Sequence, residues 1–191
     1  MEELIERLRR ARIGATFNFY RDGEGADARC ERLLTYLRSR EEARLLLVGE
    51  APGYRGARVS GVPFTSERQL TGAGPAEATA TIVHRVLGEL GIEQDVLLWN
   101  VVPTHPGTAT SNRRPTRAEV EAGLPYFREL ARVRRTIAVG RLAHSVLGGP
   151  YVRHPSHAGA GAFGAAMQRL SLGGEVLPGS LDAEPSTDRV K

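Results

Sequence analysis

Apolar residues recur along this chain with the spacing of helix faces, interrupted by short runs that are apolar at nearly every position. The helical spacing predicts helices over residues 1–12, 26–40, 75–90, 116–133, 141–147 and 160–170. The continuous apolar runs predict strands over residues 44–48, 95–102, 136–139 and 151–153. Strands that alternate with helices predict a parallel sheet covered on both faces, which is an α/β fold of the three-layer α/β/α type.

The predicted elements form one domain over residues 1–170, because no linker and no internal repeat divides the chain. Residues 171–191 contain Gly, Pro, Asp and Ser without periodicity, and we expect a loosely ordered tail there. Pro75 is expected in the first turn of its helix, and Thr116 with Glu119 has the spacing of a capping box. The connections over 49–74 and 103–115 are longer than simple turns, which favours functional loops.

Composition limits the classes of protein to which this chain can belong. A chain of 191 residues can bury a full core, and no apolar run is long enough to span a membrane. Cys30 is the only cysteine, which excludes intrachain disulfides and clusters held by several cysteines. The charged N-terminal segment does not resemble a signal peptide, so we expect a cytoplasmic protein, monomeric and without membrane contact.

The basic residues suggest an anionic partner without proving one. The net charge is +4, and every basic side chain except Lys191 is arginine. Two explanations of the excess of arginine stay open. One is a codon bias toward arginine, and the other is contact with phosphates, for which the guanidinium group is suited. Arg113 and Arg114 are adjacent in the long loop 103–115, where they form either a phosphate-binding pair or a solvent-exposed pair.

Polar side chains follow the predicted strands at the points where these strands end. Glu50 follows the first strand, Asn100 lies at the end of the apolar run Leu97–Trp99, and His154 follows the fourth strand. The carboxyl ends of parallel strands meet at one sheet edge, where such folds bind ligands, so we expect one active site. A nucleotide-phosphate cradle after the first strand is disfavoured, because neither a Gly-x-Gly-x-x-Gly nor a Gly-Lys-Ser/Thr pattern is present.

The first three candidates carry distinct chemistry. Glu50, partly desolvated at a strand end, can hold or activate a water molecule, or it can brace its own loop. The Asn100 amide offers a donor and an acceptor side by side, which matches O4 and N3–H of uracil, or it pairs with backbone groups. Phe64, in Gly-Val-Pro-Phe at 61–64, can stack on a flipped base or pack in the core.

His154 and the residues after it form the last candidate segment. A histidine at this place can donate a hydrogen bond to a developing anion. A metal site shared with His157 is disfavoured, because Pro155 interrupts the helical spacing and no carboxylate or thiolate lies nearby in the sequence. Ser156 and the N–H groups that follow it can hold a phosphate.

Four segments together resemble the uracil-DNA glycosylase superfamily. They are Gly-Glu-Ala-Pro-Gly at 49–53, Gly-Val-Pro-Phe at 61–64, Leu-Leu-Trp-Asn at 97–100 and His-Pro-Ser at 154–156. The resemblance covers about residues 44–170 and implies an α/β/α sandwich with a central four-stranded parallel sheet. It implies a DNA repair enzyme, at the bacterial nucleoid, that flips uracil from single- or double-stranded DNA and hydrolyses its N-glycosidic bond. The products would be an abasic site and free uracil, and no cofactor or metal is implied.

The resemblance also implies roles for individual residues. Phe64 would stack on uracil beside Gly49 and Ala51, and Asn100 would read its edge. His154 would stabilise negative charge on uracil O2, and Glu50 would position the attacking water. The predicted DNA-binding residues are Arg113, Arg114, Ser156, His157, Ala158 and Gly159. A non-catalytic lesion-binding relative, and a glycosylase for another deaminated base such as hypoxanthine or xanthine, remain open.

The chain departs from the family pattern in three places. The best-known members have Gly-Gln-Asp-Pro-Tyr in the first segment, whereas Ala51 stands at the aspartate position and Gly53 at the tyrosine position. The tyrosine would crowd a thymine methyl group, so another residue, such as Tyr54, would have to exclude thymine. Gly-Glu-Ala-Pro-Gly resembles a thermophile-type branch with a four-cysteine iron–sulfur cluster, which a single cysteine cannot supply. The bulky wedge that usually follows His-Pro-Ser is replaced by His157 and Ala158.

Overall fold

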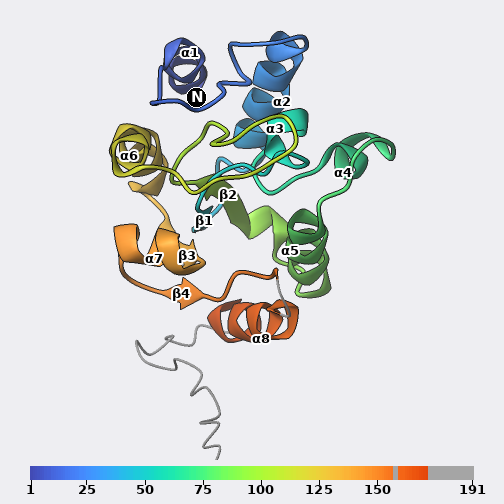
Figure 1. Cartoon of the computed structure of the whole chain (residues 1–191). Coiled ribbons are helices and arrows are strands. Elements are labelled where there is room, and N and C mark those ends of the chain that lie inside the picture. The colour runs from blue at the N-terminus through green and yellow to red at the C-terminus, as the bar shows by residue number, and fades with distance from the viewer. Residues whose placement is uncertain (157–158, 172–191) are drawn as a thin grey trace, which may run out of the picture.

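Four parallel strands form one sheet in the computed structural model, which describes residues 1–156 and 159–171 (Figure 1). The strands are β1 (Leu45–Gly49), β2 (Val96–Asn100), β3 (Arg135–Val139) and β4 (Tyr151–Val152). Their order across the sheet is β2-β1-β3-β4, and each neighbouring pair is parallel. This confirms the predicted four-stranded parallel sheet.

Helices cover both faces of this sheet (Figure 1). On one face lie α1 (Glu2–Arg10), α2 (Ala26–Ser39), α6 (Arg117–Ala131) and α7 (Arg141–Leu147). On the other face lie α5 (Ala78–Glu89) and α8 (Ala160–Ser171). Leu46 and Val48 of β1 pack into the first layer, and Leu47 between them packs into the second. Because both faces are buried, the strand is apolar at successive positions, and the three-layer sandwich is confirmed.

The pairing register places several strand ends at the same level. Gly49 lies beside Asn100 in the β1–β2 pair. The chain continues the pattern past β2, because the N–H groups of Val101 and Val102 donate to the carbonyls of Gly49 and Glu50 at 2.9 and 3.1 Å. The residues that follow β1 and β2 are therefore held together at the carboxyl edge of the sheet.

The long connection after β1 is more regular than its composition indicates. It contains two short helices that the hydrophobic pattern does not predict, α3 (Ala57–Ser60) and α4 (Glu67–Thr71). The helix expected from Pro75 begins only at Ala78, so that prediction is wrong. The Pro75 carbonyl accepts a hydrogen bond from the Arg68 N–H at 3.2 Å, which ties residue 75 to α4 instead of α5.

Other boundaries agree closely with the predictions. Thr116 and Glu119 form the predicted capping box at the start of α6, and a short 3₁₀ turn, η1 (Glu93–Asp95), precedes β2. The predicted tail begins at Ser171, which is the last residue of α8, and residues 172–191 lie outside the described residues. Of the helices in the described ranges, none is both long and apolar enough to cross a bilayer.

Candidate active site

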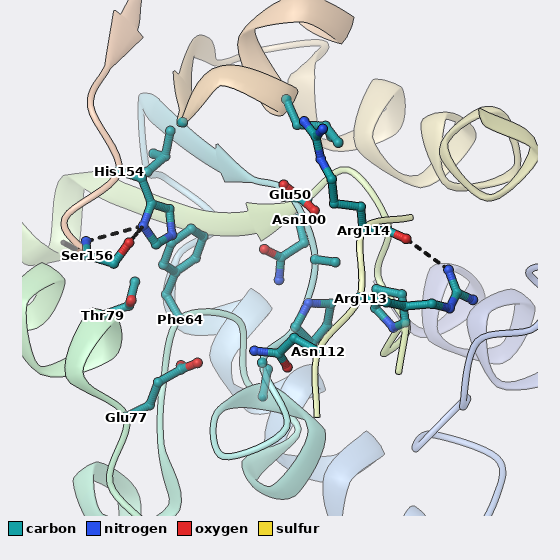
Figure 2. A pocket seen from close by; sticks show the side chains of 18 of the residues that line it. Glu50, Phe64, Glu77, Thr79, Asn100, Asn112, Arg113, Arg114, His154 and Ser156 are labelled. Carbon is teal, nitrogen blue, oxygen red and sulfur yellow. Dashed lines mark hydrogen bonds between the residues drawn. The ribbon is translucent and has the colours of Figure 1, made fainter. Parts of the chain in front are cut away.

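A pocket of about 410 Å³ opens at the carboxyl edge of the sheet and collects most of the predicted site residues (Figure 2). This volume lies within the range of about 300–1,000 Å³ that is common for small-molecule sites. The predicted residues that line it are Glu50, Ala51, Phe64, Asn100, Arg113, Arg114, His154 and Ser156. The first and last of these residues, Glu50 and Ser156, are more than a hundred positions apart in the sequence, so the fold alone brings them together.

Two predicted glycines lie next to the pocket without lining it. A Cβ atom on Gly49 would lie 2.4 Å from Phe64 Cζ, and one on Gly159 would lie 2.1 Å from the His154 carbonyl oxygen. Any side chain at either position would therefore displace a site residue. His157 and Ala158 lie outside the described residues, so their contacts with DNA stay predictions.

Phe64 is held in a backbone conformation that side-chain-bearing residues rarely adopt. Its φ is +53°, and its ring lies over the bare backbone of Gly49, close to Asn100. Strain of this kind persists only when the surroundings impose it, and it concentrates at functional sites. Phe64 is 8% exposed and Asn100 4% exposed, so a planar ligand between them would be largely shielded from water.

A hydrogen-bonded chain behind Phe64 supplies part of that constraint. The Thr65 hydroxyl donates to the Pro63 carbonyl at 3.1 Å and lies 3.0 Å from His84 Nε2. His84 Nδ1 in turn lies 2.9 Å from Glu93 Oε1. No sequence pattern singles out His84, because it lies within a predicted helix and outside all four motifs.

Glu50 and Arg114 create the main electrostatic feature of the pocket. Burial raises the pKa of the Glu50 carboxyl, and the positive charge of Arg114 offsets part of this rise. Both side chains line the pocket (Figure 2). A half-buried carboxylate with few competing solvent contacts can hold a water molecule in a defined position.

His154 is oriented by the residue two positions further on. Its Nδ1 accepts a hydrogen bond from the Ser156 N–H at 3.3 Å and lies 2.8 Å from the Ser156 hydroxyl (Figure 2). An imidazole nitrogen that accepts from a backbone N–H carries no proton itself, so the proton of the neutral ring is on Nε2. His154 thus presents Nε2–H as a hydrogen-bond donor.

The two predicted arginines have different surroundings. Arg113 forms two hydrogen bonds to Glu119, at 2.8 and 2.6 Å, and Glu119 also accepts from the N–H groups of Ala15 and Thr116. These contacts lower the pKa of the buried Glu119 to about 2. Arg113 therefore braces its loop against α6, while Arg114 lines the pocket near Glu50.

A buried histidine joins the two loops that form this side of the pocket. His105 is fully buried, with Nδ1 2.8 Å from the Pro52 carbonyl and Nε2 2.9 Å from the Thr108 carbonyl. The sequence placed His105 in a long loop without a role. Only the tertiary structure brings it against the segment that carries Glu50.

The pocket also has lining residues that the sequence analysis missed. Glu77 and Thr79, at the start of α5, line it opposite the sheet edge, and Asn112 accepts a hydrogen bond from the Tyr54 N–H at 2.9 Å. Tyr54 was expected to exclude thymine, but it is not among the lining residues, and Arg55 stacks on its ring at 5.4 Å. The lining of the pocket gives no support to the expected role of Tyr54, which stays a prediction.

The residues present do not fit an iron–sulfur cluster. The sequence has a single cysteine, whereas such a cluster takes four thiolates, and the Cys30 thiol is buried and donates to the Tyr20 carbonyl at 3.3 Å. In the part of the chain that the structure describes, no three His, Cys, Asp or Glu side chains are grouped to hold a metal ion.

Comparisons with known proteins give a family and a similar fold. Residues 38–178 match the family model described as the Uracil DNA glycosylase superfamily. The Type-4 uracil-DNA glycosylase of Pyrobaculum aerophilum is 34% identical over 107 residues, which cover 54% of this chain and 47% of that protein. The chain thus aligns with about half the length of this curated relative. The crystal structure of Pedobacter heparinus SMUG2 has a similar fold, with a TM-score of 0.63 and 12% identity over 90% of this chain and 95% of that one.

The Glu119 cluster generates a stability prediction. Replacing Glu119 with Gln is expected to lower the free energy of unfolding at pH 7 by about 2–4 kcal/mol, because Arg113 and two backbone N–H groups lose a charged acceptor. The pKa of Glu119 is lowered from 4.5 to about 2 on folding, so its contribution is present above about pH 4.5 and is lost as the pH falls toward 2. Urea unfolding between pH 7 and pH 3 measures both effects.

Glu121→Gln is the matched control for this experiment. Glu121 lies on the same helix, is exposed, and pairs with the exposed Arg117. Its replacement is expected to change stability by less than about 1 kcal/mol. Two results would contradict the stabilising role of Glu119. One is an equal loss of unfolding free energy in both variants, and the other is a Glu119→Gln variant that loses as much stability between pH 7 and pH 3 as the wild type does.

Proposed function

The chain belongs to the uracil DNA glycosylase superfamily, and we propose that it flips uracil out of DNA and hydrolyses its N-glycosidic bond, leaving an abasic site. The observation that carries this proposal is the convergence of Phe64, Asn100, His154 and Glu50 on one pocket. These four side chains supply a stacking surface, an edge-reading amide, an anion-stabilising donor and a water-positioning carboxylate.

Recognition of uracil rests on Phe64 and Asn100. The ring of Phe64 provides a planar apolar surface, and the Asn100 amide donates to O4 and accepts from N3–H of a base that lies on it. Cytosine presents the opposite polarity at these two positions, which would leave the nearly buried amide unpaired. Sites that hydrogen-bond their substrate in this way discriminate strongly against mismatched analogues.

The chemical step requires an anion stabiliser and one water molecule. The bond between C1′ and N1 breaks with its electron pair moving to the base, which leaves an oxocarbenium-like sugar, and the oxygen of water then bonds to C1′. His154 donates from Nε2 to the negative charge that develops on uracil O2. Glu50 holds the attacking water on the sugar side and accepts the proton that this water loses as its oxygen bonds to C1′. Uracil leaves as an anion and takes up one proton, so the products are the abasic sugar and neutral uracil.

DNA binding is assigned to the rim of the pocket. Arg114 and Ser156 line it and suit contacts with the phosphates beside a flipped nucleotide. Arg113 contributes by holding the Arg114 loop in place through Glu119. Gly159 and the neighbouring residues 157–158 are assigned to the DNA near the gap left by the base.

The direct test is base release from a panel of otherwise identical oligonucleotides. Each carries one uracil, hypoxanthine or xanthine, in single- and double-stranded form, and abasic sites are scored by alkaline cleavage. Release of uracil is the expected result. Tight binding without release of any base would identify a lesion-binding relative, and release of hypoxanthine or xanthine alone would identify a different base specificity.

The role of His154 predicts a large rate effect. His154→Ala is expected to lower the rate of uracil release from single-stranded DNA by about 10²–10³-fold, because one preorganised donor to the departing anion is lost. His144→Ala is the matched control, since His144 is exposed on α7, contacts the Tyr151 ring in a tilted arrangement and does not line the pocket. Wild-type activity in His154→Ala would remove this residue from the mechanism.

The role of Asn100 predicts a loss of recognition. Asn100→Asp keeps the size of the side chain but replaces the donor to O4 with a second acceptor and adds a negative charge beside a developing anion. We expect kcat/KM for uracil to fall by about 100-fold or more. Steady-state kinetics measure this fall, and a thermal melting curve checks that the strand end is intact. Unchanged kinetics would exclude the edge-reading role.

A further inference from the structure

Glu77 is a second carboxylate in the pocket, and it lies outside the four segments that carry the family resemblance. It precedes α5, where its carbonyl accepts the N–H of Thr81 at 3.0 Å, and its side chain lines the pocket with Phe64 and Asn100. In Figure 2 the Glu77 side chain lies on the side of Phe64 away from His154. The mechanism above gives this carboxylate no task.

Two glycines make room for the Glu77 carboxylate. A Cβ atom on Gly53 would lie 2.0 Å from Glu77 Oε1, and one on Gly56 would lie 2.2 Å from Oε2. Neither position can carry a side chain while Glu77 keeps its place. The carboxylate therefore fills the space that a side chain at residue 53 would otherwise occupy at the wall of the pocket.

The orientation of the bound base, which rests on the proposed function, determines what faces this carboxylate. Asn100 pairs with O4 and N3–H, and His154 donates to O2. C5 is the ring atom opposite C2, so a substituent on C5 points away from His154. Glu77 lies on the side of the pocket away from His154 (Figure 2). In this orientation of the base, C5 and any group attached to it therefore point toward the Glu77 side chain.

We propose that Glu77 is a specificity-determining residue that excludes pyrimidines with a 5-methyl group, and thymine in particular. The first reason is volume, because the carboxylate occupies space beside C5 that the methyl group would need. The second is solvation, since a methyl group against a carboxylate would remove water that the charge needs. Burial raises the pKa of Glu77 because the charged form is already partly desolvated, so losing the water that remains would be costly.

The test compares two bases in the same DNA. Glu77→Ala and the wild type are assayed on single-stranded oligonucleotides that differ only in one uracil or one thymine, with abasic sites scored by alkaline cleavage. We expect the ratio of kcat/KM for thymine to that for uracil to rise at least about tenfold in Glu77→Ala, the usual effect of one methyl-sized space. Glu77→Gln keeps the volume but removes the charge, so its ratio is expected to lie between those of the wild type and Glu77→Ala.

Glu89→Ala is the matched control, because Glu89 lies on the same helix, is exposed and faces Arg85 instead of the pocket. Its base ratio is expected to equal that of the wild type. The proposal is overturned if Glu77→Ala releases uracil with an unchanged ratio. It is also overturned if that variant melts like the wild type yet releases neither base, since Glu77 would then serve the reaction itself. A wild type that releases no uracil would instead overturn the proposed function.

Discussion

The candidate site depends on the in-register pairing of β1 with β2. This pairing places Gly49 beside Asn100 and ends both strands at the same level of the sheet. A slip of one residue would turn every side chain of a strand to the other face, which would remove Asn100 from the pocket. The backbone hydrogen bonds of the β1–β2 pair, which Val101 and Val102 continue beyond β2, hold this register.

Glycines at and just after the end of β1 leave space for side chains from residues further along the chain, and these side chains form walls of the pocket. Gly49 leaves room for the ring of Phe64, and Gly53 and Gly56 leave room for the carboxylate of Glu77. In each case the glycine and the side chain that fills its space lie between the last residue of β1 and the start of α5, but in different parts of that connection. These walls of the pocket thus depend on pairs of residues, in which a glycine leaves the space that the side chain of its partner fills.

Buried polar groups hold the loops that carry the site. His105 joins the carbonyls of Pro52 and Thr108. Glu119 joins Arg113 to the backbone N–H groups of Ala15, which follows α1, and Thr116, which precedes α6. Such groups are costly when unpaired and strongly orienting when fully hydrogen-bonded. They allow two long loops to hold defined positions at the edge of a rigid sheet.

The sequence alone determined the order of the strands and helices along the chain, the class of fold and eight of the residues that line the pocket. It could do so because burial on both faces makes strands uniformly apolar, and because polar residues after parallel strands share one edge. It did not determine α3, α4 or the true start of α5, where short contacts such as that between Arg68 and Pro75 outweigh local preference. It also did not reveal Glu77, His84 or His105 as parts of the site. Their positions follow from contacts across distant segments, which no local pattern records, and only the tertiary structure decided them.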